Sequence, residues 1–502
     1  MFTKWPVFRP RLFTKITKPL FASLRELGHL NSPYIDDSIL LGESWEECAL
    51  NVKETVELAM KLGFVVHPDK SIFDPTQLIE FLGFWINSVD MVVTLTESKA
   101  HTIRQLCLDL INYKKPTIRT VAKVVGKMVA SFPAVRFGKL FYRRIDNEKT
   151  TALKLNRGDY ESKMKLSDSA KSDLQWWVDN ILTNYCPIVE SKPDIVVYSD
   201  ASLKGWGGVR DKLSTGGNWS ENEAKIHINI LELMAAQYVL ASLCKNDRNI
   251  HVRMMIDNKT AVAYVNGMGG RKNTCNKITR LIWDWCRERN IWISAAYITS
   301  QENFEADRMS RISHNNAEWA LNNNMFDKIV EKIGRPSIDM FASRLNYKCE
   351  RYVAWQPDPF AEAVDAFSLD WGNEQLIYIF PPFCIINRVL QKIDLDRANA
   401  IVIVPYWTTQ PWWSKLLNLL TDMPFFFTRT NAALSHPDEL PNMDLLVCSL
   451  SGEPWRQMRY HSKRRKLSWQ DGEVPRVNNI RFTKTGGRSM CIGGVYHCLH
   501  PL

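Results

Sequence analysis

The sequence predicts a multidomain protein of the α/β and α+β classes. The chain has 502 residues, which is too long for a single hydrophobic core. Its composition, 45% hydrophobic and 24% charged, is that of ordinary folded proteins. Short apolar runs alternate with helical patterns along its central and C-terminal parts, which is typical of sheets covered by helices.

The charge and cysteine content limit the possible environments. Lysine and arginine (64) exceed aspartate and glutamate (54), and this excess fits either a polyanionic partner or an ordinary solvated surface. The 11 cysteines form no CxxC pair, which favours reduced thiols. The first residues lack a signal-peptide core, and no apolar run is long enough to cross a bilayer. We therefore expect an intracellular protein, cytoplasmic or nuclear, with no membrane partner.

Residues 1–94 predict a small α+β unit. A helical pattern over residues 11–28 precedes a hairpin with Asp36 and Asp37 at its tip, and a second helix is expected over residues 45–62. A strand over residues 64–67 and a strand pair around Phe81 and Phe84 follow. Adjacent carboxylates at a hairpin tip either bind a divalent ion with a nucleotide's phosphates or are ordinary turn residues, and both interpretations stay open.

Residues 95–194 predict helices and a connection. Two amphipathic helices are expected over residues 95–113 and 117–132, within a helical region that ends at residue 145. The polar composition from Asp146 onward predicts a linker up to residue 194, with one helix over residues 167–182. That helix carries Trp176 and Trp177, which either stack on nucleic-acid bases or pack in a core.

Residues 195–312 predict a mixed sheet with helices. A strand over residues 195–198 leads into a glycine-rich meander, and strands over residues 251–256 and 291–298 alternate with helices. The alternation makes these later strands parallel to the first. Asp200 and Asp257 follow two of the parallel strands, so both are expected at the carboxyl edge of the sheet.

Two further acids belong to the same region. Glu232 lies in the apolar helical segment INILELMAA, where an unpaired carboxylate costs several kcal/mol, so either a shared cation or a salt bridge is expected to compensate it. Asp307 enters from a short final helix. Four carboxylates from four separate elements are what a two-metal nuclease site requires.

Residues 313–450 predict another α/β domain. A helix over residues 318–334 precedes strands over residues 351–355, 376–380 and 400–404. Residues 451–502 are expected to be a basic tail, in which the run KRRK at 463–466 is either a nuclear import signal or phosphate-binding arm, or part of a disordered segment.

Motifs in the first third resemble the later palm motifs of reverse transcriptases. They are YIDD, HPDKS and FLGF, in this order. The resemblance implies a partial palm over residues 1–94 and a thumb or connection over residues 95–145. It implies that Asp36 and Asp37 bind catalytic magnesium and that a nucleotide or primer contacts Tyr34, Lys70, Phe81, Leu82 and Gly83. Because the fingers and the upstream metal-binding aspartate of that family have no match here, we expect no polymerase activity from this chain, although it can still grip a template-primer.

Four central motifs resemble the catalytic blocks of type 1 ribonuclease H domains. They are SDASLKGWGG, INILELMAA, IDNKTAVAYVN and NFEADRMSR. The resemblance implies that two Mg²⁺ ions, with Mn²⁺ as an expected substitute, are held by Asp200, Glu232, Asp257 and Asp307. The implied activity is hydrolysis of the RNA strand of RNA:DNA hybrids. Lys204, Arg271, Lys272 and Lys277 are candidate phosphate contacts or ordinary exposed cations.

The C-terminal motifs IDMFASRLN, VDAFSLDW, FPPF and PYWTTQPWW resemble the domain that follows ribonuclease H in polyproteins of DIRS-group tyrosine-recombinase retrotransposons. The whole chain matches that order, so other retroelement proteins are implied partners. The layout is also similar to adenine-N6 methyltransferases, but Phe380 replaces the polar residue before Pro381, and we expect no methyl transfer. The alternative function is a domesticated nucleic-acid-binding protein without catalysis.

Overall fold

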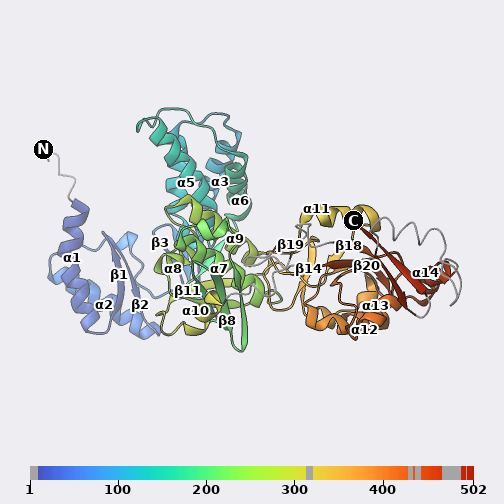
Figure 1. Cartoon of the computed structure of the whole chain (residues 1–502). Coiled ribbons are helices and arrows are strands. Elements are labelled where there is room, and N and C mark those ends of the chain that lie inside the picture. The colour runs from blue at the N-terminus through green and yellow to red at the C-terminus, as the bar shows by residue number, and fades with distance from the viewer. Residues whose placement is uncertain are drawn as a thin grey trace, which may run out of the picture. The chain divides into compact units, whose positions relative to one another are not determined.

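A computed structural model describes residues 9–312, 320–427, 434–435, 443–465, 488–492 and 495–501 (Figure 1). The chain divides into two compact units, Met1–Ser191 and Lys192–Leu502. Mixed helices and sheets form both units, as the sequence predicted. Within the described ranges, no helix is both long and apolar enough to cross a membrane.

Unit 1 begins with a hairpin flanked by two helices. The elements are α1 (Arg9–Glu26), β1 (Leu30–Tyr34), β2 (Asp37–Leu41) and α2 (Trp45–Lys61). A small apolar cluster joins α1 to α2 through Leu24 and Ala59. The fully buried Asn51 of α2 donates hydrogen bonds from Nδ2 to the carbonyls of Leu30 and Leu41, at 2.8 and 2.9 Å. This amide therefore fixes the base of the hairpin to the helix.

The prediction of a strand over residues 64–67 is wrong. Residues 64–67 form no strand; Phe64 instead lies against α1, with its ring 6.2 Å from that of Phe13. Phe64 and Val66 pack against the cluster between α1 and α2, whereas Val65 is exposed, so packing against helices explains two of the three apolar residues that suggested a strand. A short 3-10 turn over Pro68–Lys70 follows.

The rest of unit 1 combines a four-stranded antiparallel sheet with helices. The sheet order is β3-β4-β5-β6, and the elements are β3 (Leu78–Phe81), β4 (Phe84–Asn87), β5 (Val92–Leu95), α3 (Glu97–Asn112), α4 (Ile118–Val129), α5 (Gly138–Leu155), α6 (Asp168–Asn180) and β6 (Tyr185–Pro187). Leu82 and Gly83 have φ of 54° and 76°. Positive φ at both positions gives the tight two-residue hairpin that matches strand twist.

The linker predicted from Asp146 is also contradicted. Helix α5 continues to Leu155, and α6 packs on α3 and α5 before β6 pairs with β5. Trp177 is fully buried, and a Cβ on Gly138 would lie 2.9 Å from its ring, so the packing interpretation of this tryptophan is confirmed. Trp176 stacks on Phe141 with ring centres 4.0 Å apart. The polar side chains that suggested a linker are the exposed positions of an amphipathic helix.

Unit 2 starts with a five-stranded sheet in the order β11-β10-β7-β8-β9. Its strands are β7 (Ile195–Ala201), β8 (Gly205–Arg210), β9 (Leu213–Asn218), β10 (His251–Ile256) and β11 (Trp292–Tyr297). Strands β7, β10 and β11 are parallel, and β7, β8 and β9 form the antiparallel meander, as predicted. The helices are α7 (Ile228–Leu243), α8 (Lys259–Asn266), α9 (Asn273–Arg287) and α10 (Phe304–Arg311).

The second part of unit 2 contains a nine-stranded sheet in the order β15-β14-β13-β16-β17-β20-β18-β22-β21. Its strands are β13 (Ile338–Asp339), β14 (Arg351–Ala354), β15 (Ala363–Val364), β16 (Ile377–Ile379), β17 (Asn399–Pro405), β18 (Phe425–Phe427), β20 (Leu445–Ser451), β21 (Arg488–Ile492) and β22 (Val495–Pro501). The first five strands of this order are mutually parallel, and β20 is antiparallel to both β17 and β18. This α/β architecture agrees with the sequence prediction.

Helices cover both faces of this sheet. Alternate residues of β17 point to opposite faces: Ile401 and Ile403 pack with α11 (Asn323–Ile333), whereas Val402 packs with α12 (Ile386–Leu395) and α13 (Trp413–Asn418). The helix predicted from residue 318 begins at Asn323, after the short strand β12 (Ala320–Leu321) that pairs with β19 (Leu434–Ser435).

The predicted basic tail is partly folded. Pro454–Arg465 forms α14, and β22 pairs with β18 in parallel, so the chain after residue 451 contributes to the sheet. The described side chains do not include the KRRK run at 463–466. Its two interpretations therefore stay predictions.

Candidate active site

Two carboxylates meet at the carboxyl edge of the five-stranded sheet. Asp200 lies near the end of β7, and Asp257 directly follows β10. The two strands are parallel neighbours, and their register places Ile256 beside Ser199. The next residue on each strand is therefore one of the two aspartates, which is the arrangement that the sequence predicted.

Glu232 completes the group from helix α7. Glu232 and Asp200 are each 4% exposed, and one carboxylate oxygen of each lies within 4.8 Å of the others and of an oxygen of Asp257. The helix approaches the sheet closely, because a Cβ on Gly208 of β8 would lie 2.3 Å from a methyl carbon of Val239. A glycine on the strand thus makes room for the helix that carries the acid.

The electrostatics of this group are unfavourable without a counter-charge. Burial, together with the negative charges of Asp200 and Asp257, raises the pKa of Glu232 to about 9. Burial is also the main cause that raises the pKa of Asp200 to about 6. Oε2 of Glu232 is buried without a hydrogen-bond partner. Such a carboxylate stays protonated near neutral pH unless a cation compensates its charge.

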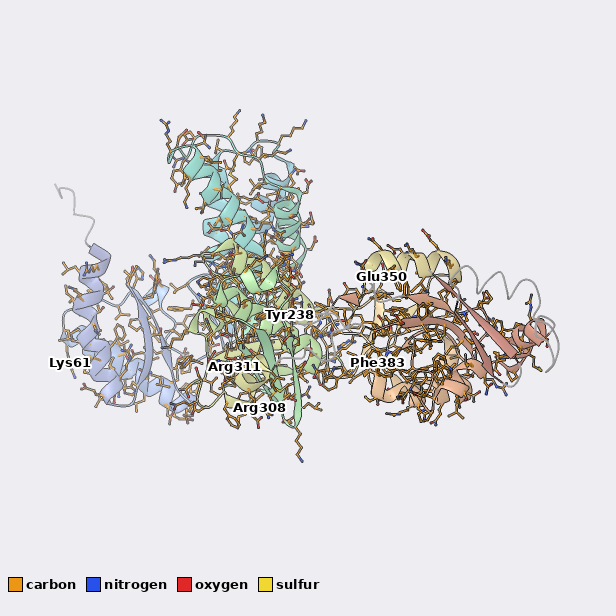
Figure 2. All side chains as sticks on the ribbon, in the orientation of Figure 1. Lys61, Tyr238, Arg308, Arg311, Glu350 and Phe383 are labelled. Atoms are coloured by element: carbon orange, nitrogen blue, oxygen red, sulfur yellow. The ribbon has the colours of Figure 1, made fainter. Side chains whose placement is uncertain are left out.

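Asp307 lies outside this three-carboxylate group. Its Oδ1 accepts hydrogen bonds from Arg311 at 2.6 and 2.8 Å within α10 (Figure 2 labels Arg311). The helix itself is firmly held on the sheet, since Asn303 donates to the carbonyl of Ser199 at 3.1 Å and Ser202 donates to that of Ser310 at 2.7 Å. Asp307 is close enough for its charge to contribute to the raised pKa of Asp200.

Sequence reasoning missed two features of this edge. The hydroxyl of Ser300 donates to Oδ2 of Asp257 at 2.8 Å, and the ammonium of Lys259 lies 5.0 Å from the centre of the Tyr297 ring. No sequence signal marks Ser300, whereas Tyr297 and Lys259 could have been found from their places at the end of β11 and the start of α8. The candidate phosphate contacts are exposed, as expected for either of their interpretations: Lys204, Arg271, Lys272 and Lys277.

The YIDD hairpin presents a weaker site. Tyr34 pairs with Asp37 across the turn, and Asp36 and Asp37 are exposed. Among the residues that the structure describes, no third potential ligand joins them in a metal-binding group. Lys70 is exposed in its 3-10 turn. Metal binding by Asp36 and Asp37 therefore stays a prediction, with no third ligand beside them in the part of the chain that the structure describes.

The predicted primer-contacting turn is joined to a basic surface. Lys99 of α3 places Nζ 3.4 Å from the carbonyl oxygen of Leu82 and 3.9 Å from the centre of the Phe84 ring. Burial and the nearby charge of Lys127 lower the pKa of Lys99. Lys127 lies on α4 beside the exposed Gly126, where an added Cβ would contact no other atom within 4 Å.

Comparisons with known proteins give distant structural matches. No protein-family model and no curated protein sequence matches the chain. A foamy viral protease–reverse transcriptase in complex with double-stranded DNA is 18% identical over 57% of this chain and 49% of that chain, with a TM-score of 0.31. The foamy viral enzyme in complex with an RNA/DNA hybrid is 17% identical over 57% and 38%, with a TM-score of 0.31. Ribonuclease H1 from Halobacterium salinarum is 13% identical over 23% of this chain and 92% of that chain, with a TM-score of 0.20. The chain thus spans about half or less of the two viral proteins.

Proposed function

We propose that unit 2 contains a metal-dependent nuclease that hydrolyses the RNA strand of RNA:DNA hybrids. The observation that carries the proposal is the group formed by Asp200, Glu232 and Asp257, whose carboxylate oxygens lie within 4.8 Å of one another. Asp307 is the proposed fourth ligand, close enough to Asp200 to contribute to its raised pKa but paired with Arg311.

The donor set fits a hard divalent cation. All three grouped residues offer carboxylate oxygens, the ligands that Mg²⁺ prefers, and Mn²⁺ accepts the same ligands. The alternative for Glu232 was a salt bridge to lysine or arginine. No ion pair of Glu232 occurs among the described residues, and its Oε2 lacks a hydrogen-bond partner. A buried carboxylate without a cationic partner supports a bound metal as the missing compensation.

When bound, two such ions would supply an activated water and stabilise the departing oxygen of a phosphodiester. The chain's own residues have separate roles around that chemistry. Ser300 orients Asp257 through its hydrogen bond, and the packing of α7 on β8 holds Glu232 at the edge. Lys259 and Tyr297 offer a cation and a ring to the backbone and sugar of a bound strand.

Cleavage of an end-labelled RNA:DNA hybrid in Mg²⁺ tests the proposal. We expect wild type to cut the RNA strand, and Asp200→Asn and Glu232→Gln to reduce the rate by at least about 100-fold, because each change removes a ligand charge. Asp211→Asn is the matched control, since Asp211 is 84% exposed in the β8–β9 turn and its positive φ suits asparagine. Equal cleavage by wild type and Asp200→Asn, or none by either, would refute the nuclease proposal and favour the non-catalytic alternative.

For unit 1 we propose binding of a template-primer duplex without polymerisation. The supporting observation is the exposed face of α4, where Lys123 and Lys127 flank Gly126 and leave room for close approach. Glycine inside a helix costs about 1 kcal/mol relative to alanine, so open space beside it favours an external partner. Lys123→Glu with Lys127→Glu should weaken duplex binding and its salt dependence, while Lys154→Glu on α5 should not. Clear nucleotide incorporation in a primer-extension assay would contradict the predicted loss of polymerase activity.

For the C-terminal domain we propose a methyltransferase-like fold that has lost methyl transfer, in a polyprotein of a DIRS-group retroelement. The five mutually parallel strands β15-β14-β13-β16-β17, with helices on both faces, support this fold, and ligands bind at the carboxyl ends of such strands. Phe380 occupies the position where a polar group would be needed, and it packs with the apolar cluster between β16 and α11. The residues present therefore do not fit a base-amine acceptor site. Methyl transfer from labelled S-adenosylmethionine to adenine-containing DNA would overturn this view.

A further inference from the structure

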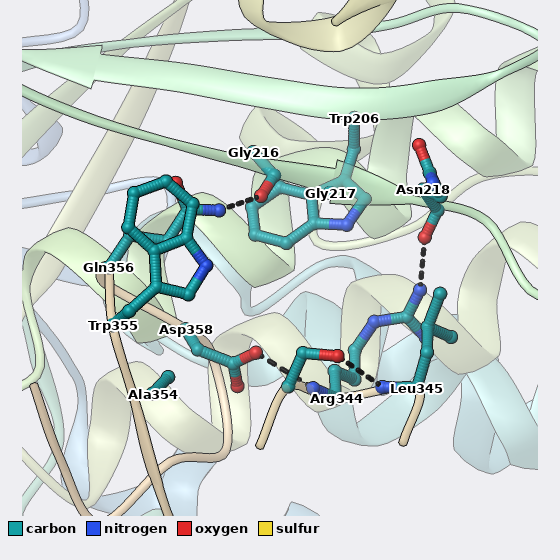
Figure 3. Close-up of a pocket in the computed structure, with 11 residues that line it drawn as sticks. Trp206, Gly216, Gly217, Asn218, Arg344, Leu345, Ala354, Trp355, Gln356 and Asp358 are labelled. Carbon is teal, nitrogen blue, oxygen red and sulfur yellow. Dashed lines mark hydrogen bonds between the residues drawn. The ribbon is translucent and has the colours of Figure 1, made fainter. Parts of the chain in front are cut away.

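The edge strand of the five-stranded sheet is covered by loops of the C-terminal domain. Strand β9 ends the sheet, so one side of its backbone has no strand partner. The amide of Gln356 donates to the carbonyl of Gly216 at 2.8 Å (Figure 3). The hydroxyl of Thr215 donates to the carbonyl of Pro357 at 2.5 Å. Covering an edge in this way removes a site of strand addition and satisfies polar backbone groups.

The guanidinium of Arg344 makes three hydrogen bonds across this surface. Its Nη1 donates to both carboxylate oxygens of Glu223 at 2.8 and 2.9 Å, and its Nη2 donates to the carbonyl of Asn218 at 2.8 Å. The side chains of Arg344 and Glu223 are only 10% and 15% exposed. The arginine's own backbone is fixed by Asp358, whose carboxylate accepts from the Arg344 N–H at 2.9 Å (Figure 3).

The same contact reaches the helix that carries Glu232. The hydroxyl of Tyr238 on α7 donates to Oε1 of Glu223 at 2.9 Å, and the Arg344 guanidinium lies 4.8 Å from the centre of the Tyr238 ring (Figure 2 labels Tyr238). Beyond the end of α7, the ammonium of Lys245 donates to backbone carbonyls of the C-terminal domain, including that of Glu362 at 3.0 Å. The C-terminal domain therefore contacts α7 near its middle and the chain just after its end.

We propose that the C-terminal domain is a fixed structural partner of the five-stranded sheet, and that it holds β9 and α7 in place through Arg344. This gives the domain a role that needs no methyl transfer. It also gives a function to the motif IDMFASRLN, in which Arg344 stands. The proposal is independent of nuclease activity, because its test measures the stability of α7 and β9.

Hydrogen–deuterium exchange and thermal unfolding of the full chain test the proposal with Arg344→Met. Because the change leaves a largely buried carboxylate unpaired, we expect the unfolding midpoint of unit 2 to fall by about 5–10 °C. Protection of amides in β9 and α7 should fall together with that of residues 343–358. Arg344→Lys should give an intermediate loss, since lysine keeps the charge but not the forked geometry.

Arg351→Met is the matched control. Arg351 belongs to the same domain, and its side chain, which is 45% exposed, pairs with the side chains of Glu362 and Glu374 at 2.6 and 2.8 Å. Lys245 donates to the backbone carbonyl of Glu362, which Arg351→Met leaves in place. We expect a midpoint shift below about 3 °C and unchanged protection of α7 and β9. Equal effects of the two substitutions, or full protection of α7 and β9 in Arg344→Met, would overturn the proposal. If Arg344→Met does not fold, Tyr238→Phe replaces it, because this change removes only the hydroxyl bonded to Glu223. Amide protection of α7 and of residues 343–358 must then fall together for the proposal to stand.

Discussion

Binding of Mg²⁺ to the carboxylate group is expected to release about one proton per chain at pH 7. The proton comes from Glu232, whose pKa is raised to about 9 by burial and by the charges of Asp200 and Asp257. With that pKa the side chain is about 99% protonated at pH 7 and about half protonated at pH 9. Asp200, with a pKa of about 6, adds only about a tenth of a proton at pH 7. A metal ion must displace these protons, because only the carboxylate binds it.

The magnitude follows from the same shift. Removing the proton from Glu232 at pH 7 costs about two pKa units, or about 3 kcal/mol, so Mg²⁺ should bind about 100-fold more weakly at pH 7 than at pH well above 9. The folded chain without metal holds a proton that the unfolded chain loses above its ordinary pKa of 4.5. Since the folded state then binds more protons, metal-free stability falls as the pH rises from about 4.5 towards about 9.

Isothermal titration calorimetry in buffers of different protonation heat measures this proton release. We expect about one proton at pH 7 and about half a proton at pH 9 for wild type and for Asp211→Asn. Glu232→Gln, which has no such proton, should release about a tenth of a proton at pH 7 if it binds Mg²⁺ at all. Thermal unfolding of the metal-free protein in a chelator should show independently that its stability falls as the pH rises from about 4.5 towards about 9. Mg²⁺ binding with no buffer dependence at pH 7 would mean that Glu232 is already ionised, and would refute the reasoning from burial.

Two substitutions test packing, and one tests charge. Gly208→Ala should destabilise unit 2 by about 1–3 kcal/mol in denaturant titration, because the added Cβ would lie 2.3 Å from a methyl carbon of Val239. Gly126→Ala should stabilise unit 1 by about 0.5–1 kcal/mol, because the added Cβ lies in open space on α4 and alanine favours the helix. Equal effects at the two glycines would contradict this assignment of close approach. Arg311→Gln should free the carboxylate of Asp307 and strengthen Mg²⁺ binding by about 2–5-fold at low salt, with the gain shrinking as salt rises. Unchanged calorimetric affinity would show that the ion pair does not compete with the metal.

The central sheet could be predicted because its signals are local. The apolar runs before Asp200 and Asp257 form the strands β7 and β10, and the two exit residues need only parallel neighbours to meet. The burial of Glu232 followed from the apolar residues around it in one helix. These inferences use periodicity within about 20 residues, where sequence patterns determine local structure directly.

The linker prediction failed where composition was weighed above periodicity. Helix α5 buries Leu140, Phe141 and Ile145 in its first half, and its charged second half was mistaken for a separate segment. The contact of Arg344 with Glu223 could not be predicted for a different reason. The two residues are separated by 121 positions, and neither carries a local signal that names its partner.

Asp307 shows where sequence reasoning about a site reaches its limit. Its helix was expected at the sheet edge, and α10 does pack on β7 and β8. The direction in which the Asp307 carboxylate points, however, depends on the nearest positive charge. Arg311 lies one helical turn away on the same exposed face of α10, and it forms an ion pair with Asp307. Asp200 and Glu232 have no such cation within hydrogen-bonding range among the described residues, so they stay together at the cost of raised pKa values. The group of Asp200, Glu232 and Asp257 therefore needs a metal ion to compensate its charges. Asp307, in contrast, must first break its ion pair with Arg311 before it can bind a metal.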